Sequence, residues 1–313
     1  EHDIKIVSID EAGSMEYIVY GYMNRGIHEG CVGIAVYHYD SLANSNEEQV
    51  FIPSDMSFEV MKSELGQLMY ATDSGEFYIM VDGDVYGIDL NTLETRVIAE
   101  GLTDEAYAIS ESNRYLAWVD ADQVYAGTTL HIMDFVTEKV TDVTEGPAKY
   151  VRPLGFMEED FIYGVANSAD VLVDAAGRTT FPMYQVKIMD TASEEHDILK
   201  TYEKAGFYVQ GITISEDTIY LNRIQNNGTA YVDANQDMIR NREGDKANTV
   251  SITTAVSEEK ETQVQIALAD SGKKKSPKIL TPKETILEEK REVSLKKENG
   301  TLRYYVYVKG TVT

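Results

Sequence analysis

The sequence predicts an all-β fold, a β-propeller of four-stranded antiparallel blades, because of a repeated phrase and an unusually high tyrosine content. Residues 85–101 read VYGIDLNTLETRVIAEG, residues 130–146 read LHIMDFVTEKVTDVTEG, and related phrases recur along the 313-residue chain. Repeats of about 40–50 residues are typical of propeller blades. Tyrosine occurs 21 times against 8 phenylalanines, and its amphipathic ring suits the half-buried face of a sheet.

Each copy of the phrase contains an aspartate that ends an alternating apolar run and begins a short polar turn. These aspartates are Asp40, Asp89, Asp134, Asp190 and Asp270. A second β-rich run follows every turn, so each copy predicts a β-hairpin. We expect the carboxylates to accept backbone N–H bonds within their turns, which is a structural role rather than a ring of catalytic acids.

A second hairpin precedes each of these, so the repeating unit has four strands, A to D. The predicted blades cover about 4–55, 66–101, 106–146, 150–203 and 207–282, with strands A and B of a partial sixth at 291–310. We therefore expect one domain, 1–313, with five complete blades and part of a sixth. Residues 223–250 are predicted as a loop insertion between strands B and C of the fifth unit, and 167–180 as a shorter insertion at the same place in the fourth.

The predicted strands are apolar on both faces, as in FIYGVA and GIAVYHY. An isolated sheet would leave one of these faces in water, whereas blades packed against one another cover both. A β-sandwich, or two unrelated β domains, is the alternative. The helix-like residues 58–66 can link the first two blades.

Residues 109–119, ISESNRYLAWV, resemble the strand-turn-strand of TolB-like propellers and of the propellers that precede the hydrolase domain of prolyl oligopeptidases. Ser110 and the run RYLA at 114–117 match the pattern, while Glu111-Ser112-Asn113 replace its Pro-Asp-Gly. The resemblance implies a propeller that binds partners through variable loops, and it transfers no functional residue. The whole chain also resembles uncharacterised exported proteins of Gram-positive bacteria in which a propeller follows an N-terminal anchor.

The net charge of −25 and the pI near 4.5 make this an acidic protein. Nucleic acid and anionic membrane surfaces would be repelled, so neither is an expected partner. The charge would instead attract a basic partner or Ca²⁺. No apolar run is long enough to span a bilayer, and Cys31 is the single cysteine, so the chain forms no internal disulfide.

The sequence contains no nucleophile elbow, zinc-protease motif, phosphate loop or dinucleotide fingerprint. Cys31 has His28 and His38 nearby in sequence, without an evident group to orient either imidazole. In DANQD, Asp233, Asn235 and Asp237 have the alternating oxygen ligands that Ca²⁺ prefers, but Met238 and Gly244 replace the glycine and glutamate of the usual loop. We expect no cofactor, with Ca²⁺ at these three residues as the alternative.

We therefore expect a non-enzymatic, extracytoplasmic binding or scaffold propeller, secreted or anchored to a membrane as a lipoprotein. It would act as a monomer that engages a protein, peptide or glycan through its loops and central mouth. A propeller enzyme that acts on carbohydrate with paired carboxylates is the first alternative. An accessory or sensor module of a larger exported protein is the second.

Overall fold

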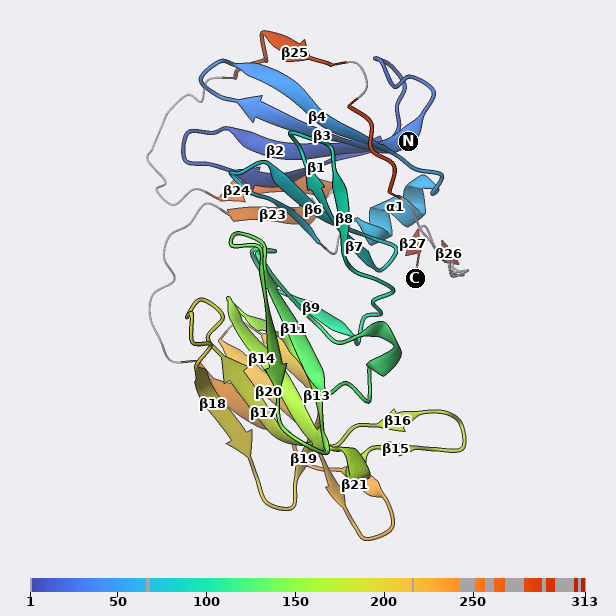
Figure 1. The fold of residues 1–313 in the computed structure, drawn as a ribbon, viewed down its shortest axis with the longest axis vertical. Helices are drawn as coiled ribbons and strands as arrows, with labels where there is room; N and C mark the ends of the chain where they lie inside the picture. The colour runs from blue at the N-terminus through green and yellow to red at the C-terminus, as the bar shows by residue number, and fades with distance from the viewer. Residues whose placement is uncertain are drawn as a thin grey trace. The chain divides into compact units, whose positions relative to one another are not determined.

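A computed structural model describes residues 2–65, 68–215, 217–241, 251–256, 262–267, 279–288, 291–295, 307–308 and 311–312. These residues are mostly β-strand, with one α-helix among them, α1 (Phe58–Glu64), whose N-cap Ser57 accepts the Val60 N–H (Figure 1). None of the helices in the described ranges has the length and apolar character needed to cross a bilayer. The chain divides into two compact units, one formed by Glu1–Ile79, Tyr86–Arg96 and Gly244–Thr313 and the other by Met80–Val85 and Val97–Glu243.

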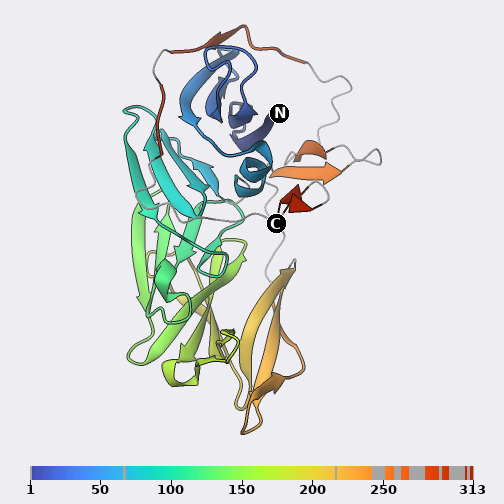
Figure 2. The ribbon, with the colours of Figure 1, turned by 90° about the vertical axis from the view of Figure 1, so that its right-hand side faces the viewer.

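The first sheet follows the predicted A–B–C–D order. Its antiparallel strands are β1 (His2–Ile9), β2 (Met15–Tyr22), β3 (Val32–Asp40) and β4 (Ser45–Pro53). A fifth strand, β25 (Glu284–Ile286), pairs in parallel with the outer edge of β4. Figure 2 shows this red-brown C-terminal segment beside the blue strands.

Residues 291–293, which the sequence predicts to begin a sixth unit, also run beside β4. The Phe51 N–H donates to the Arg291 carbonyl at 2.8 Å, and the Val293 N–H donates to the Phe51 carbonyl at 2.9 Å. The Arg291 guanidinium donates through Nε to the Gln49 carbonyl at 2.6 Å and through Nη2 to the Leu90 carbonyl. These bonds cover backbone groups that an edge strand would otherwise expose.

Two further four-stranded sheets follow. The second contains β5 (Met69–Ala71), β6 (Glu76–Val81), β7 (Asp84–Asp89) and β8 (Thr95–Ala99). The third contains β9 (Tyr107–Ile109), β10 (Tyr115–Trp118), β11 (Thr129–Asp134) and β12 (Lys139–Thr144). A 3₁₀ turn, η1 (Ala121–Gln123), lies between β10 and β11.

The fourth sheet contains β13 (Lys149–Met157), β14 (Asp160–Asn167), β17 (Met183–Met189) and β18 (Ile198–Glu203). The 3₁₀ turn η2 (Ser168–Asp170) and the hairpin β15 (Leu172–Val173) with β16 (Thr179–Thr180) occupy the predicted insertion between its B and C strands. The next hairpin, β19 (Tyr208–Ser215) with β20 (Thr218–Asn226), joins this sheet through the single pair Met183–Val209.

The described part of the predicted insertion at 223–250 belongs to the sheet. Strands β21 (Tyr231–Asp233) and β22 (Asp237–Arg240) both pair with β20, so residues up to 241 do not extend as a free loop. The remaining strands are the hairpins β23 (Ser251–Val256) with β24 (Thr262–Ala267) and β26 (Tyr307–Val308) with β27 (Thr311–Val312).

The central strands are buried on both faces. Six successive residues of β14, Phe161 to Ala166, are buried, as are all four residues of β10. Because successive side chains of a strand point to opposite faces, this burial requires packing on both sides of the sheet. In a strand that packs on one side only, buried and exposed residues would alternate. The structure confirms the predicted all-β propeller fold, built of four-stranded antiparallel sheets with strands A to D in chain order. The exact limits of the blades stay predictions.

Candidate functional site

The repeated aspartates form their turns as predicted. In Asp40, Asp89 and Asp190 the Oδ1 atom accepts the N–H groups of the residues two and three places on, at 2.7 to 3.0 Å. Asp134 accepts the N–H of Val136 at 2.9 Å. Bonds from the turn N–H groups lower the pKa of Asp40 and Asp89. The turn role is confirmed at these four positions, and Asp270 lies outside the described residues.

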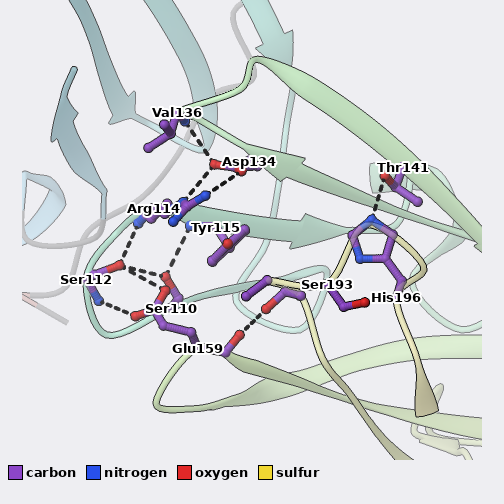
Figure 3. A network of polar contacts seen from close by, with 12 residues as sticks. Ser110, Ser112, Arg114, Tyr115, Asp134, Val136, Thr141, Glu159, Ser193 and His196 are labelled. Carbon is purple, nitrogen blue, oxygen red and sulfur yellow. Dashed lines mark hydrogen bonds and ion pairs between the residues drawn. The ribbon is translucent and has the colours of Figure 1, made fainter. Parts of the chain in front are cut away.

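The Asp134 carboxylate also forms an ion pair with Arg114, as Figure 3 shows. Arg114, the residue before β10, donates through Nε to Oδ1 at 2.9 Å and through Nη2 to Oδ2 at 2.8 Å, which is a two-point ion pair with the last residue of β11. Burial acts to raise the pKa of Asp134, but the hydrogen bonds and charge of Arg114 hold it below its usual range. Arg114, which belongs to the TolB-like run, therefore links the first hairpin of the third sheet to the second.

The same network reaches the first turn of the fourth sheet. Ser112 donates from Oγ to Glu159 Oε2 at 3.0 Å, and its N–H donates to Glu159 Oε1 at 3.3 Å. Thr191 donates its hydroxyl hydrogen bond to the Glu159 carbonyl. Figure 3 shows Ser112, in a turn of the third sheet, beside Glu159, in a turn of the fourth. Ser112 of the TolB-like turn thus links the third sheet to the fourth, while Ser110 forms hydrogen bonds within the turn, and nothing in the sequence pairs Ser112 with Glu159.

The three calcium candidates lie where β21 ends and β22 begins. Arg223 donates through Nε to the Asn235 carbonyl at 2.6 Å and through Nη1 to Asp237 Oδ2 at 3.0 Å. Tyr202 donates its hydroxyl to the same oxygen at 3.0 Å. Asp233 is exposed. The hydrogen bond from the Met238 N–H lowers the pKa of Asp237 most, and Tyr202 and Arg223 lower it further, although burial acts to raise it. Within the described ranges no three His, Cys, Asp or Glu side chains gather as metal ligands.

His28 and His38 each have an orienting carboxylate, which corrects the expectation from the sequence. His28 Nε2 lies 2.6 Å from Glu48 Oε1, and His38 Nδ1 lies 2.6 Å from Glu16 Oε1. Glu48 is 1% exposed. The sequence conceals these pairs because their members lie 20 and 22 positions apart and meet only in the folded sheet. Cys31 is exposed, and its N–H donates to the His28 carbonyl at 3.0 Å.

A cavity of about 520 Å³ opens beside the end of β8 and η1, within the second compact unit. Its apolar lining includes the aliphatic side chains of β8 and the indole of Trp118, the single tryptophan of the chain. Its polar lining consists of the carboxylates Glu100, Asp120 and Asp122. Ligand sites in proteins commonly have volumes of about 300–1,000 Å³, with apolar walls and a few polar groups.

One histidine lies next to this cavity. The His131 ring is tilted against Trp118 with centroids 5.3 Å apart, and its Nδ1 lies 2.7 Å from Asp142 Oδ1. Its Nε2 lies 3.7 Å from Asp120 Oδ1. Among the described residues no hydrogen bond or ion pair involves the side chains of Glu100 and Asp122. The cavity therefore offers an aromatic surface together with two carboxylates, Glu100 and Asp122, that have no cation beside them among the described residues.

The sequence did not identify this cavity. Its residues come from 97–102, at the end of the first copy of the repeated phrase, and from 118–122, and these two segments meet only in the folded chain. The one available signal was the single Trp118 within a run that the resemblance already explained.

No protein-family model and no curated protein matches the sequence. Solved structures resemble this fold at low identity. The β-propeller domain of the Trilobed protease from Pyrococcus furiosus is 13% identical over 74% of this chain and 71% of that one, with a TM-score of 0.32. TolB from Acinetobacter baumannii is 13% identical over 74% and 64%, with a TM-score of 0.25.

The acylaminoacyl peptidase of Pyrococcus horikoshii is also 13% identical, over 71% of this chain and 35% of that one, with a TM-score of 0.29. The chain therefore spans about a third of the peptidase and less than two thirds of TolB. These likenesses concern the propeller fold that the TolB-like turn predicts. They include no sign of the Gram-positive source that the sequence suggested.

Proposed function

We propose that this protein is a non-catalytic binding propeller that engages a protein or peptide through the cavity beside Trp118. The cavity is the observation that supports the proposal, since it combines a ligand-sized volume, an aromatic wall and unpaired polar groups. The repeated carboxylates, by contrast, are occupied by turn N–H groups and, at Asp134, by Arg114. The proposed function therefore rests on the residues that line the cavity rather than on the repeated aspartates.

We also propose that the protein acts as a monomer outside the cytoplasm, where an acidic surface would meet basic partners. Cell fractionation tests the location, and size-exclusion chromatography tests the monomer. The carbohydrate enzyme remains the second candidate, because Glu100, Asp120 and Asp122 bring several carboxylates to one cavity.

The test is selection from a phage-displayed random peptide library, followed by titration of selected peptides against the fluorescence of Trp118. We expect selected peptides to change the emission of the wild type and to bind the cavity-filling variant Ala121→Leu more weakly, because Ala121 lines the cavity. Failure to select any peptide, or equal affinity for Ala121→Leu, would refute the proposal. Turnover of a glycan panel that is lost in Glu100→Gln would establish the enzyme instead.

A further inference from the structure

We infer that the group held in this cavity is a positively charged side chain, an arginine or lysine of the partner. The inference rests on the proposed function and adds the chemistry of the ligand. It follows from three properties of the cavity: its uncompensated negative charge, its aromatic wall and its aliphatic lining.

The charge is the first property. Glu100 and Asp122 have no cationic partner in the part of the chain that the structure describes, and Asp120 has only the His131 imidazole, at 3.7 Å. The Asp120 side chain is 62% exposed, so it remains accessible to a ligand. A guanidinium or ammonium entering here would meet up to three carboxylates that the protein itself does not neutralise. A neutral or anionic group would leave these charges uncompensated or add to them.

The contrast with the other carboxylates of the second unit supports this assignment. Asp134 is paired with Arg114, Glu145 with Lys187 and Asp237 with Arg223, at 2.8, 2.6 and 3.0 Å between the charged atoms. The fold thus places a cation beside several of its partly buried carboxylates. The exposed carboxylates at the cavity have only the His131 imidazole near Asp120, so a cationic partner can supply the remaining positive charge.

The walls suit a long basic side chain. Trp118 is 7% exposed and lines the cavity. A cation beside an indole is attracted by the negative face of the ring, and more strongly as the cation is desolvated. Val97, Ile98 and Leu102 supply aliphatic surface for the methylene stem, as lysine and arginine stems pack along apolar surface while their charged ends stay at polar groups. The net charge of −25 would in addition draw a basic partner towards the protein.

The experiment compares two blocked pentapeptides, acetyl-Gly-Gly-Arg-Gly-Gly-amide and the same peptide with citrulline, which keeps the shape of arginine and lacks its charge. Binding to the whole chain is followed by the emission of Trp118, the single tryptophan. We expect the citrulline peptide to bind about two- to fivefold more weakly, since one partly exposed charge contact contributes up to about 1 kcal/mol. Raising the salt concentration should weaken only the arginine peptide.

The variants Glu100→Gln and Asp122→Asn should each weaken the arginine peptide about two- to fivefold, on the same basis. Glu195→Gln is the matched control. It removes the same charge from an exposed position in the Asp190 turn, outside the cavity lining, and should leave binding unchanged. The melting temperature of each variant shows whether it remains folded.

Equal binding of the arginine and citrulline peptides, or wild-type affinity in the Glu100→Gln, Asp122→Asn double variant, would overturn this inference. The proposed function fails in a different way. Library peptides without basic residues could bind the wild type and the double variant equally and bind Ala121→Leu more weakly. That result would support the binding function and refute the cationic ligand. If no library peptide binds at all, the proposed function itself falls.

Discussion

Replacement of Asp134 by alanine should destabilise the third sheet measurably. The change removes both bonds of the Arg114 ion pair and the bond from the Val136 N–H. Bonds to a charged group contribute about 1.5–3 kcal/mol when buried, and exposed ion pairs about 0–1 kcal/mol. The Asp134 carboxylate is 17% exposed and the Arg114 side chain 36% exposed, so the pair lies between these limits. We expect a loss of about 2 kcal/mol in the free energy of unfolding at pH 7.

The assay is urea unfolding followed by the fluorescence of Trp118, which lies on β10, the strand beside β11 that ends at Asp134. Arg114→Met removes the ion pair but keeps the turn bond, so it should cost less than Asp134→Ala. A free energy of unfolding for Asp134→Ala within about 0.5 kcal/mol of the wild type, which is usual for surface substitutions, would refute the reasoning.

The effect should depend on pH in one direction. Because the folded state holds the pKa of Asp134 below its ordinary value, the carboxylate contributes fully above the unfolded pKa of about 3.9. The contribution is lost as the pH falls from there through the lower folded pKa. The wild type and Asp134→Ala should therefore converge in acid, and a difference that widens below pH 4 would contradict the account.

Three other predictions follow from individual contacts. Burial raises the pKa of Glu16 despite its bond to a histidine. Its contribution to stability should therefore fall as the pH rises from the unfolded pKa of about 4.3 through the higher folded pKa. Unfolding of Glu16→Gln measured over the same pH range should lack this fall. Arg291→Met should speed hydrogen exchange at the Phe51 amide, which donates to the Arg291 carbonyl; unchanged protection would mean that the side chain does not hold the segment. Added Ca²⁺ should leave the melting temperature unchanged, because Asp237 is engaged by a guanidinium; a rise that Asp233→Ala abolishes would instead establish the calcium site.

The sequence predicted the parts of the fold that local chemistry determines. The Asp-led turns need only an acceptor two or three residues before the N–H groups it binds, and this spacing is visible in the chain. Alternating apolar runs predicted the hairpins, and apolar residues on both faces predicted blades packed on each side. These are contacts between near neighbours, or properties of a single strand.

The contacts that escaped prediction join residues that are distant in sequence. Ser112 and Glu159 are 47 positions apart, and Glu48 lies 20 positions from His28. The sequence predicts a loop where β21 and β22 lie, because this Asn- and Asp-rich segment lacks the usual apolar alternation. Arg223 on β20 donates a hydrogen bond to the Asn235 carbonyl and so holds this segment beside the strand. No local sequence pattern predicts that contact.

The central distinction lies between the repeated aspartates, which build turns, and the carboxylates at the cavity, which we infer bind a ligand. The measurement that tests it most directly is the dissociation constant of the arginine pentapeptide for two variants, Asp190→Ala and the double variant Glu100→Gln, Asp122→Asn. We predict wild-type affinity and a lower melting temperature for Asp190→Ala, since its Oδ1 accepts two turn N–H groups. The double variant should bind the peptide more weakly and keep the melting temperature of the wild type. Lost affinity in Asp190→Ala at a temperature where it is folded, with wild-type affinity in the double variant, would contradict the account.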